Sequence, residues 1–308
     1  MILTICPNPS IDCTIELDNL NVGMLNRVRN KVETYSGKAL NAAIGVSRLS
    51  ESVFATGFMF EDHAKLFEQV LEREGVKYDF VLSKGAARVN YKIIDKKSML
   101  TEINDKGESV ERALQISLID KIRKLSEECD IAVVSGSLPN GVSSEFYGEM
   151  ISAIPKRVKI IVDTEKDNME AAIKGGDIFM VKPNLRELEN FAEREVSDFH
   201  EMINAAKAYL DKGVKYVMIS LGADGAILTD GIENFYCKSA TVAVNSTVGA
   251  GDSMVAAACV GLTRSVPMKE ILRMSVAAGT ASITTSGTNL FYKDKYDEIY
   301  SKIYVERI

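Results

Sequence analysis

Short apolar runs alternate with helical patterns along most of this chain, and this alternation limits the possible folds more than any other feature. Strands that are apolar on both faces and joined by helices form a parallel sheet covered by helices on both sides. The sequence therefore predicts an α/β fold with a mostly parallel central sheet flanked by helices. The predicted strands are Ile2–Ile5, Val53–Thr56, Ile131–Ser135, Lys159–Asp163, Ile178–Val181 and Val214–Ser220. The predicted helices include His63–Glu74, Ser117–Glu128, Ser143–Ile154 and His200–Lys212.

The last part of the chain has a different pattern. From Asp252 to Arg307 it predicts three helices, with a break rich in glycine and threonine near Thr284–Thr288. There is no internal repeat, low-complexity tract or linker. We therefore expect residues 1–308 to form a single domain.

Three segments alternate with a period of two instead. They are Ile11–Leu17, Arg88–Ile93 and a stretch in which Arg27, Arg29 and Lys31 share one side. A period of two gives a strand one apolar and one polar face. The segments predict a small separate sheet, built from about residues 11–34 and 87–103. Its polar face would carry Asp12, Arg27, Arg88, Asn90 and Lys92. For any single one of these residues a solvated strand surface is an equally good explanation, but together they favour an anionic ligand.

Composition excludes several classes of protein. The net charge is −6 and no basic run is present, which argues against a nucleic-acid partner. The five cysteines are odd in number and form no CxxC pair, so neither a disulfide framework nor a zinc site is expected. No apolar run reaches the roughly 20 residues that a membrane span needs, and no leader is evident. We expect a cytoplasmic location.

One acidic residue stands at the start of an apolar helix, in the stretch Gly249-Ala250-Gly251-Asp252. Small residues allow the backbone to approach a ligand closely, and the free N–H groups of a helix N-terminus attract anions. Asp252 could equally serve only as the helix cap. The stretch does not match the dinucleotide pattern, since Met254 occupies the third glycine position, and the chain has no P-loop.

Four further polar stretches follow predicted strands or begin helices. In an open α/β sheet, ligands bind at the carboxyl ends of the strands, so these stretches are expected to meet at one site. In one of them, Asn184 and Glu187 lie three residues apart, a spacing that a capping box would also explain. The stretches are Ser36–Asn41, Ser135–Pro139, Lys182–Glu187 and Ser220–Gly225.

These motifs resemble those of the PfkB-type carbohydrate kinases, which have the ribokinase-like fold. The order NPSID, SGKALN, RVNYKI, SGSLPNG, VKPNLREL, SLGADG and TVGAGDS spans nearly the whole chain. It is most similar to the phosphosugar branch, the fructose-1-phosphate and tagatose-6-phosphate kinases. The chain departs from the family at Ser36 and Ala39, where glycine is usual.

The resemblance implies phosphoryl transfer from ATP, with Mg²⁺, to a hydroxyl of a ketohexose phosphate. It implies that Asp252 is the general base and that the backbone around Gly249, Ala250 and Gly251 holds the transferred group. It also implies three sets of binding residues. The sugar phosphate would contact Asp12, Arg27, Ser36, Gly37, Lys38, Asn41, Arg88, Asn90 and Ser137. ATP would contact Lys182, Asn184, Ser220, Leu221, Gly222, Ala223, Asp224, Gly225, Gly251 and Asp252. Magnesium would be held, through water, by Asn184 and Glu187.

Fructose 1-phosphate is the favoured acceptor, to give fructose 1,6-bisphosphate. The alternatives are a tagatose-6-phosphate kinase, another sugar or nucleoside kinase of the family, and a non-catalytic sugar-phosphate sensor. The small sheet would be a lid over the sugar. Its apolar face would leave Ile11, Cys13, Ile15, Val89, Tyr91 and Ile93 outside the main core. A bare apolar face of this kind predicts a homodimer formed through the lids.

Overall fold

The computed structural model describes residues 1–97, 99–285 and 290–308 and confirms an α/β fold of the ribokinase-like kind. In its large sheet the strands lie in the order β15-β14-β13-β12-β11-β10-β9-β1-β4-β5, with β6 also paired to β4. All pairs from β12 to β5 are parallel. The strands of this parallel part are β1 (Ile2–Cys6), β4 (Val53–Phe60), β5 (Lys77–Tyr78), β6 (Val81–Ser83), β9 (Ile131–Ser135), β10 (Lys159–Asp163), β11 (Met180–Val181) and β12 (Tyr216–Ser220).

All six predicted apolar runs contain strands of this sheet. The predicted bounds of β9 and β10 agree with the structure, whereas β4 is longer and β11 shorter than predicted. An antiparallel edge was not predicted. It consists of β13 (Ala226–Thr229), β14 (Asn234–Cys237) and β15 (Val305–Arg307).

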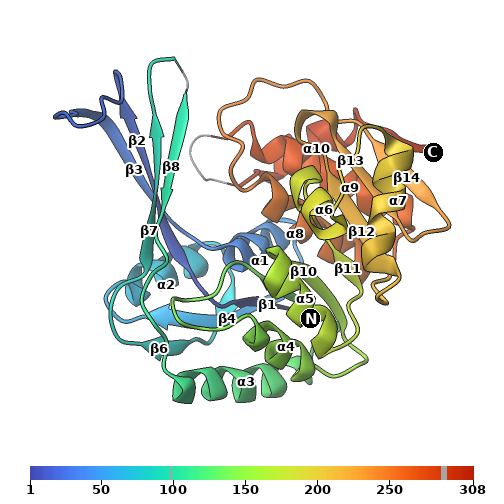
Figure 1. Cartoon of the computed structure of the whole chain (residues 1–308), viewed down its shortest axis with the longest axis horizontal. Helices are drawn as coiled ribbons and strands as arrows, with labels where there is room; N and C mark the ends of the chain where they lie inside the picture. Colours follow the sequence, from blue (N-terminus) through green and yellow to red (C-terminus); the bar gives the residue numbers. More distant parts are fainter. Residues whose placement is uncertain (98, 286–289) are drawn as a thin grey trace.

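Helices cover both faces of the large sheet (Figure 1). One layer contains α1 (Lys38–Arg48), α8 (Ala250–Thr263), α9 (Met268–Ser282) and α10 (Lys293–Tyr300), which contact one another in the order α1-α8-α9-α10. A second row of contacts runs in chain order from α3 to α7: α3 (Arg112–Ser126), α4 (Glu145–Ser152), α5 (Lys166–Gly175), α6 (Leu185–Ala192) and α7 (Phe199–Leu210). Helix α2 (Ala64–Arg73) packs beside β5, and a short 3-10 helix spans Gly222–Asp224. None of the helices in the described residues combines the length and the hydropathy of a membrane span.

The three predicted C-terminal helices are present as α8, α9 and α10, but the prediction of helix up to Arg307 was wrong, because the chain ends in strand β15. Residues 305–307 complete the sheet edge beside β14, and that pairing decides their conformation. The predicted break near Thr284–Thr288 falls partly on residues 286–289, which lie outside the described residues.

The predicted small sheet is also present, with the strand order β3-β2-β7-β8. Its strands are β2 (Ser10–Leu17), β3 (Val28–Ser36), β7 (Arg88–Ile94) and β8 (Leu100–Asn104). Strands β2 and β7 pair in parallel, and each has an antiparallel outer neighbour. The four strands project from the helical body next to α1 and α2 (Figure 1).

The prediction for β3 was wrong in one respect. Lys31 pairs with Ile15, which places it on the face of the small sheet opposite to Asp12, and Arg27 precedes the strand. Residues 28–33 of β3 are exposed, because it is an edge strand. Neither face of β3 is therefore fixed by burial. For this reason the alternation in its sequence did not predict which face lies toward the active site.

Candidate active site

A cavity of about 500 Å³ lies at the carboxyl ends of the parallel strands, between the large and the small sheet. This central cavity is the position in which open α/β sheets bind ligands. Of the predicted site residues, it is lined by Asp12, Ser36, Gly37, Lys38, Asn41, Arg88, Asn90, Ser137, Lys182, Asn184, Glu187, Ser220, Gly249, Gly251 and Asp252. The structure thus brings together residues from nearly every part of the chain.

Asp252 lies in the first turn of α8, where the chain enters the helix through Gly249. Gly249 has a φ of 80°, in the left-handed region that favours glycine. The Asp252 side chain is buried and accepts a hydrogen bond from Asn41 Nδ2 at 2.7 Å. Burial raises the pKa of Asp252 to about 6, although Lys38 nearby lowers it. A carboxylate with such a pKa can accept a proton near neutral pH.

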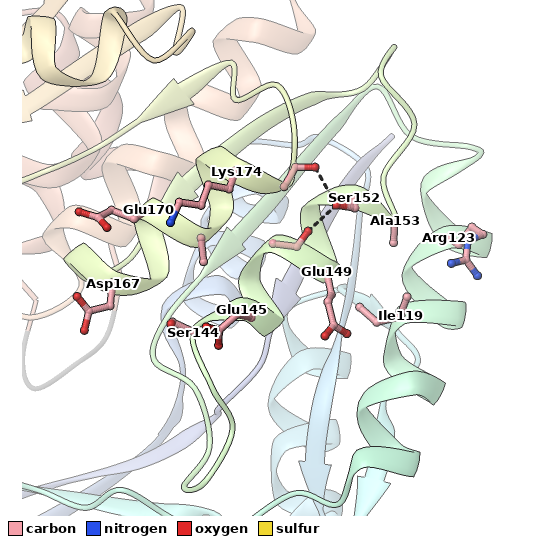
Figure 2. A pocket seen from close by; sticks show the side chains of 13 residues that line it. Ile119, Arg123, Ser144, Glu145, Glu149, Ser152, Ala153, Asp167, Glu170 and Lys174 are labelled. Atoms are coloured by element: carbon pink, nitrogen blue, oxygen red, sulfur yellow. Dashed lines mark hydrogen bonds between the residues drawn. The ribbon is translucent and has the colours of Figure 1, made fainter.

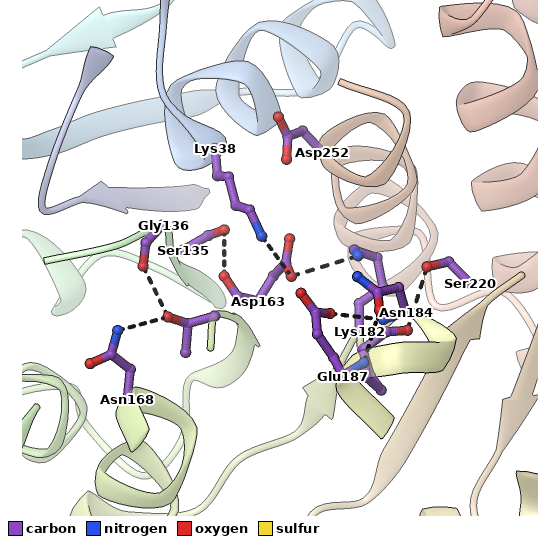
Figure 3. A network of polar contacts seen from close by, with 12 residues as sticks. Lys38, Ser135, Gly136, Asp163, Asn168, Lys182, Asn184, Glu187, Ser220 and Asp252 are labelled. Atoms are coloured by element: carbon purple, nitrogen blue, oxygen red, sulfur yellow. Dashed lines mark hydrogen bonds and ion pairs between the residues drawn. The ribbon is translucent and has the colours of Figure 1, made fainter. Parts of the chain in front are cut away.

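A second buried carboxylate, Asp163, ends strand β10. Its Oδ1 atom lies 3.4 Å from Lys38 Nζ and 3.6 Å from Lys182 Nζ (Figure 3). Burial favours the neutral acid, but the two lysines together hold the pKa of Asp163 below its ordinary value. In turn, the Asp163 carboxylate raises the pKa of Lys38. The three charges leave a surplus of one positive charge next to Asp252.

The backbone at Gly251 allows Lys182 to approach the start of α8. A Cβ atom at position 251 would lie 3.1 Å from Lys182 Nζ, closer than nearly all real contacts of that kind. Glycine at this position therefore lets the ammonium group lie against the N-terminal turn of α8. The first N–H groups of that turn and the lysine can act on the same anion.

The wall formed by the small sheet is centred on Asp12. Lys92 Nζ donates to Asp12 Oδ2 at 2.9 Å, and both side chains are less than a tenth exposed. Asn90 Nδ2 and Ser10 Oγ both donate to Asp12 Oδ1, at 3.1 and 3.3 Å. The pleat explains this grouping, since Asp12 and Asn90 are neighbours across the β2–β7 pair.

Arg88 differs from the lysines of the central cavity. Its Nη1 donates to the backbone oxygen of Asp105 at 3.2 Å, and its buried Nε has no partner within the described part of the chain. No carboxylate in the described part of the chain forms an ion pair with Arg88. Arg88 is therefore a cation with unused donors at the cavity wall, which is what an anionic ligand requires.

Ser137 is positioned by a residue that the sequence did not single out. Asn8 is buried, and its Nδ2 lies 3.4 Å from Ser137 Oγ and 3.0 Å from the oxygen of Leu138. The same amide reaches the oxygen of Lys106, in the segment that returns from the small sheet. Asn8 thus ties the loop after β1 to the loop after β9 and to the base of the small sheet.

Asn184 and Glu187 form the capping box of α6. Asn184 Oδ1 accepts from the Glu187 N–H at 2.9 Å, and Glu187 Oε2 accepts from the Asn184 N–H at 2.8 Å. Both side chains nevertheless line the central cavity. Over residues 1–97, 99–285 and 290–308, no group of three or more His, Cys, Asp or Glu is arranged to hold a metal ion.

Several predicted site residues do not line the central cavity. Arg27 lies in the exposed segment before β3, and Ala250, the first residue of α8, is not part of the lining. Of the predicted nucleotide loop only Ser220 reaches the cavity, while Leu221 and Asp224 line a neighbouring depression. The remaining residues of that loop, Gly222, Ala223 and Gly225, line neither.

The cavity also contains residues that were not among the predicted set. They are Ser10, Lys92, Glu102, Asn104, Gly136, Asp163, Thr164, Glu165 and Val248. Lys92 was predicted to lie on the polar face of the small sheet, with Asn90 and Arg88, but was not assigned to the site. Asp163 carries no such signal, since its partners come from residues 38 and 182.

A larger depression of about 660 Å³ lies elsewhere, between α3, α4 and α5 (Figure 2). Helices α4 and α5 approach closely there, since a Cβ atom on Gly175 would meet the oxygen of Gly148. Its lining charges have both signs, among them Arg123, Glu149 and Lys174. It is open to solvent and has none of the buried charges of the central cavity.

A helix N-terminus, a buried carboxylate beside it and two lysines at the carboxyl edge of a parallel sheet define the class of protein: an enzyme that transfers a phosphoryl group. Comparison with known proteins then identifies the family. The family model "pfkB family carbohydrate kinase" matches residues 7–295, and the chain belongs to that family.

The relatives are similar along their whole length. The chain is 29% identical to a 1-phosphofructokinase of Vibrio cholerae serotype O1, covering 100% of this chain and 97% of the relative. It is 30% identical to a tagatose-6-phosphate kinase of Staphylococcus epidermidis, covering 99% of each. A structure of phosphofructokinase-2 from Escherichia coli with substrates and products superposes with a TM-score of 0.90, at 30% identity, covering 98% of each chain.

Proposed function

We propose that this kinase transfers the γ-phosphoryl group of ATP to a ketohexose phosphate, with fructose 1-phosphate as the favoured acceptor and fructose 1,6-bisphosphate as product. The observation that carries the proposal is the placement of Asp252. It is a buried carboxylate with a pKa near 6, at the mouth of a helix whose N–H groups face the same cavity.

Asp252 would act as the general base. It takes the proton of the acceptor hydroxyl as the oxygen attacks the γ-phosphorus, and the bond to the leaving oxygen of ADP breaks. Negative charge on the transferred group would be stabilised by the N-terminal turn of α8 and by Lys182. Asn41 holds the carboxylate in place through its 2.7 Å hydrogen bond.

The sugar would lie against the small sheet, with its hydroxyls on Asp12, Asn41 and Asn90. Arg88 is the proposed ligand of the phosphate that the sugar already carries, because its buried Nε has no partner among the described residues. Ser137 would contribute from the loop after β9, and Ser36 and Gly37 would line the pocket. Lys38, which lines the same cavity, was predicted to bind the same phosphate, and its ammonium group also lies 3.4 Å from Asp163 Oδ1.

ATP would enter past Lys182, Asn184 and Ser220. Kinases of this family use ATP with a divalent metal ion, which would here be Mg²⁺ held through water by Asn184 and Glu187. The residues fit that ion, since Mg²⁺ keeps several waters and needs few carboxylates, and Glu187 Oε1 has no protein partner in the described part of the chain. When bound, the ion supplies positive charge that neutralises the phosphate oxygens.

Tagatose 6-phosphate is the second candidate acceptor, because a tagatose-6-phosphate kinase matches this chain as well as a 1-phosphofructokinase does. A coupled assay of ADP release tests both. It would compare fructose 1-phosphate, tagatose 6-phosphate, fructose 6-phosphate, fructose and ribose at equal concentration. The highest kcat/KM with fructose 1-phosphate supports the proposal, and a preference for a free sugar would contradict it.

We also propose that the small sheet is a lid and that two lids form the contact of a homodimer. Part of the predicted apolar face is covered within the chain, since Ile11 and Cys13 are buried. On the neighbouring strand, Tyr35 packs edge-on against Phe67 of α2. Tyr91 and its cross-strand partner Ile103 remain exposed and support an interface there. The smaller exposed area makes this contact less extensive than the sequence implied.

A further inference from the structure

Asp163 occupies a position in the central cavity that the roles above do not explain. Its side chain is 2% exposed, and one of its oxygens, Oδ1, contacts two lysines from different elements. The residue is also fixed by its backbone. Its carbonyl oxygen accepts from Ser135 Oγ at 2.9 Å and from the Gly136 N–H at 3.2 Å. The carboxylate is thus held rigidly between Lys38 and Lys182 (Figure 3).

We propose that Asp163 is a positioning residue for phosphoryl transfer: it holds Lys38 and Lys182 beside the transferred group and keeps both away from Asp252. This inference rests on the proposed function. Three charged side chains face Asp252, namely Lys38 from α1, Asp163 from β10 and Lys182 from the segment after β11. Among the described residues Asp252 receives its one hydrogen bond from the neutral amide of Asn41.

The physical reason is competition for the lysines. Lys182 is buried, and an unpaired buried charge is very costly, so it requires a carboxylate partner. Lys38 is 42% exposed and is attracted to the same carboxylate. Without Asp163, the carboxylates that remain near Lys38 are Asp252 and Glu187. A lysine paired with Asp252 would hold it ionised but make it a poor proton acceptor. By taking both lysines, Asp163 leaves Asp252 free as a base and leaves one surplus positive charge for the phosphoryl group.

The test is Asp163→Asn, which keeps the shape and removes the charge. We expect kcat to fall by about 10²-fold, the scale of an effect caused by misplaced catalytic groups. The acid limb of the kcat/KM profile should move to lower pH by about one unit, because the lysines then act on Asp252. Asp167→Asn is the matched control: it makes the same change on an exposed side chain four residues further along, and neither quantity should move.

A second variant covers the case in which Asp163→Asn does not fold. Lys38→Gln removes a cation that faces Asp252, so the acid limb should move to higher pH, opposite to the first variant. An acid limb that moves in neither variant would overturn the inference. So would an Asp163→Asn enzyme whose activity returns in excess Mg²⁺, because Asp163 would then be a metal ligand. A wild-type chain inactive on every sugar phosphate tested would instead overturn the proposed function, and this inference with it.

Discussion

The two ends of the central cavity bury carboxylates in different ways. At the small-sheet end, Asp12 has one lysine partner at 2.9 Å and two neutral donors, so its charge is matched one to one. At the other end, which we call the transfer end, Asp163 serves two lysines at 3.4 and 3.6 Å, and Asp252 has an amide as its hydrogen-bond donor.

The difference suggests a division of roles: the small-sheet end recognises the sugar, and the transfer end carries out phosphoryl transfer. A one-to-one buried pair has no charge left over and serves to fix geometry, which suits a wall that reads hydroxyl groups. A shared carboxylate leaves positive charge for phosphate and a second carboxylate that burial keeps basic. If this division is correct, substitutions at the transfer end should change kcat, and those at the small-sheet end should change KM or stability.

The largest effect is expected at Asp252. Asp252→Asn should lower kcat by roughly 10²–10⁴-fold, the contribution of a general base, while ATP and the sugar phosphate still bind. Calorimetric titration and a coupled assay on the same preparation separate the two quantities. Near-normal turnover in the variant would contradict the role of Asp252 as general base.

The ion pair of the small sheet should dominate stability. Lys92→Met leaves Asp12 buried and unpaired, which costs about 3–5 kcal/mol of unfolding free energy. Lys96→Met is the matched control, because Lys96 contacts Asp18 at the same 2.9 Å with both side chains more than half exposed. It should cost far less, because solvent screens an exposed pair. Urea denaturation measures both, and equal losses would mean that burial does not distinguish the two pairs.

Arg88 tests whether the small-sheet end binds the resident phosphate. Removing a charge-assisted hydrogen bond costs about 1.5–3 kcal/mol, so Arg88→Ala should raise KM for the sugar phosphate by about 10–10²-fold. The KM for ATP should change little. Arg29→Ala, on exposed strand β3, is the control with no expected effect. A similar rise in both KM values would contradict the assignment.

The pH dependence of activity and of stability should report the protonation of Asp252 at the transfer end. Since burial raises the pKa of Asp252 to about 6, kcat/KM should fall about tenfold for each unit below pH 6, as the base becomes protonated. Stability should change in the opposite sense. The folded-state pKa lies above the ordinary aspartate value of 3.8, so the free energy of unfolding declines as pH rises between these values. Asp252→Asn should remove both trends.

The smallest effect on chemistry is expected from the outer face of the small sheet. Tyr91→Asp together with Ile93→Asp should give monomers with weaker sugar binding and a largely intact nucleotide site. Sedimentation at micromolar concentration measures the subunit number. A wild-type monomer, or a double variant that stays dimeric, would place the proposed contact elsewhere or remove it.

Sequence alone predicted the parallel sheet and the small sheet, because apolar runs and period-two alternation report burial on two faces or one. The predicted Asp252, Asn41 and Lys182 meet in the cavity because the N-terminal turns of α8 and α1 lie at the edge of the sheet where β11 ends. The residues that the sequence misplaced or missed also have physical explanations. Arg27 and Lys31 were misplaced because burial does not orient an exposed edge strand. Asp163 was missed because its role depends on lysines from distant segments, and a local sequence pattern does not show contacts between such segments.

The pairing of β2 with β7 has a consequence for how the protein is made. Asp12 and Lys92 are separated by 80 positions, and β2 has no parallel neighbour until β7 has been synthesised. At translation rates of about 5–20 residues per second, strand β2 waits roughly 4–16 s for this partner. During that time Asp12 is solvated and the apolar side of β2 is uncovered. This sheet is therefore completed only after the β1-α1-β4 unit has been synthesised.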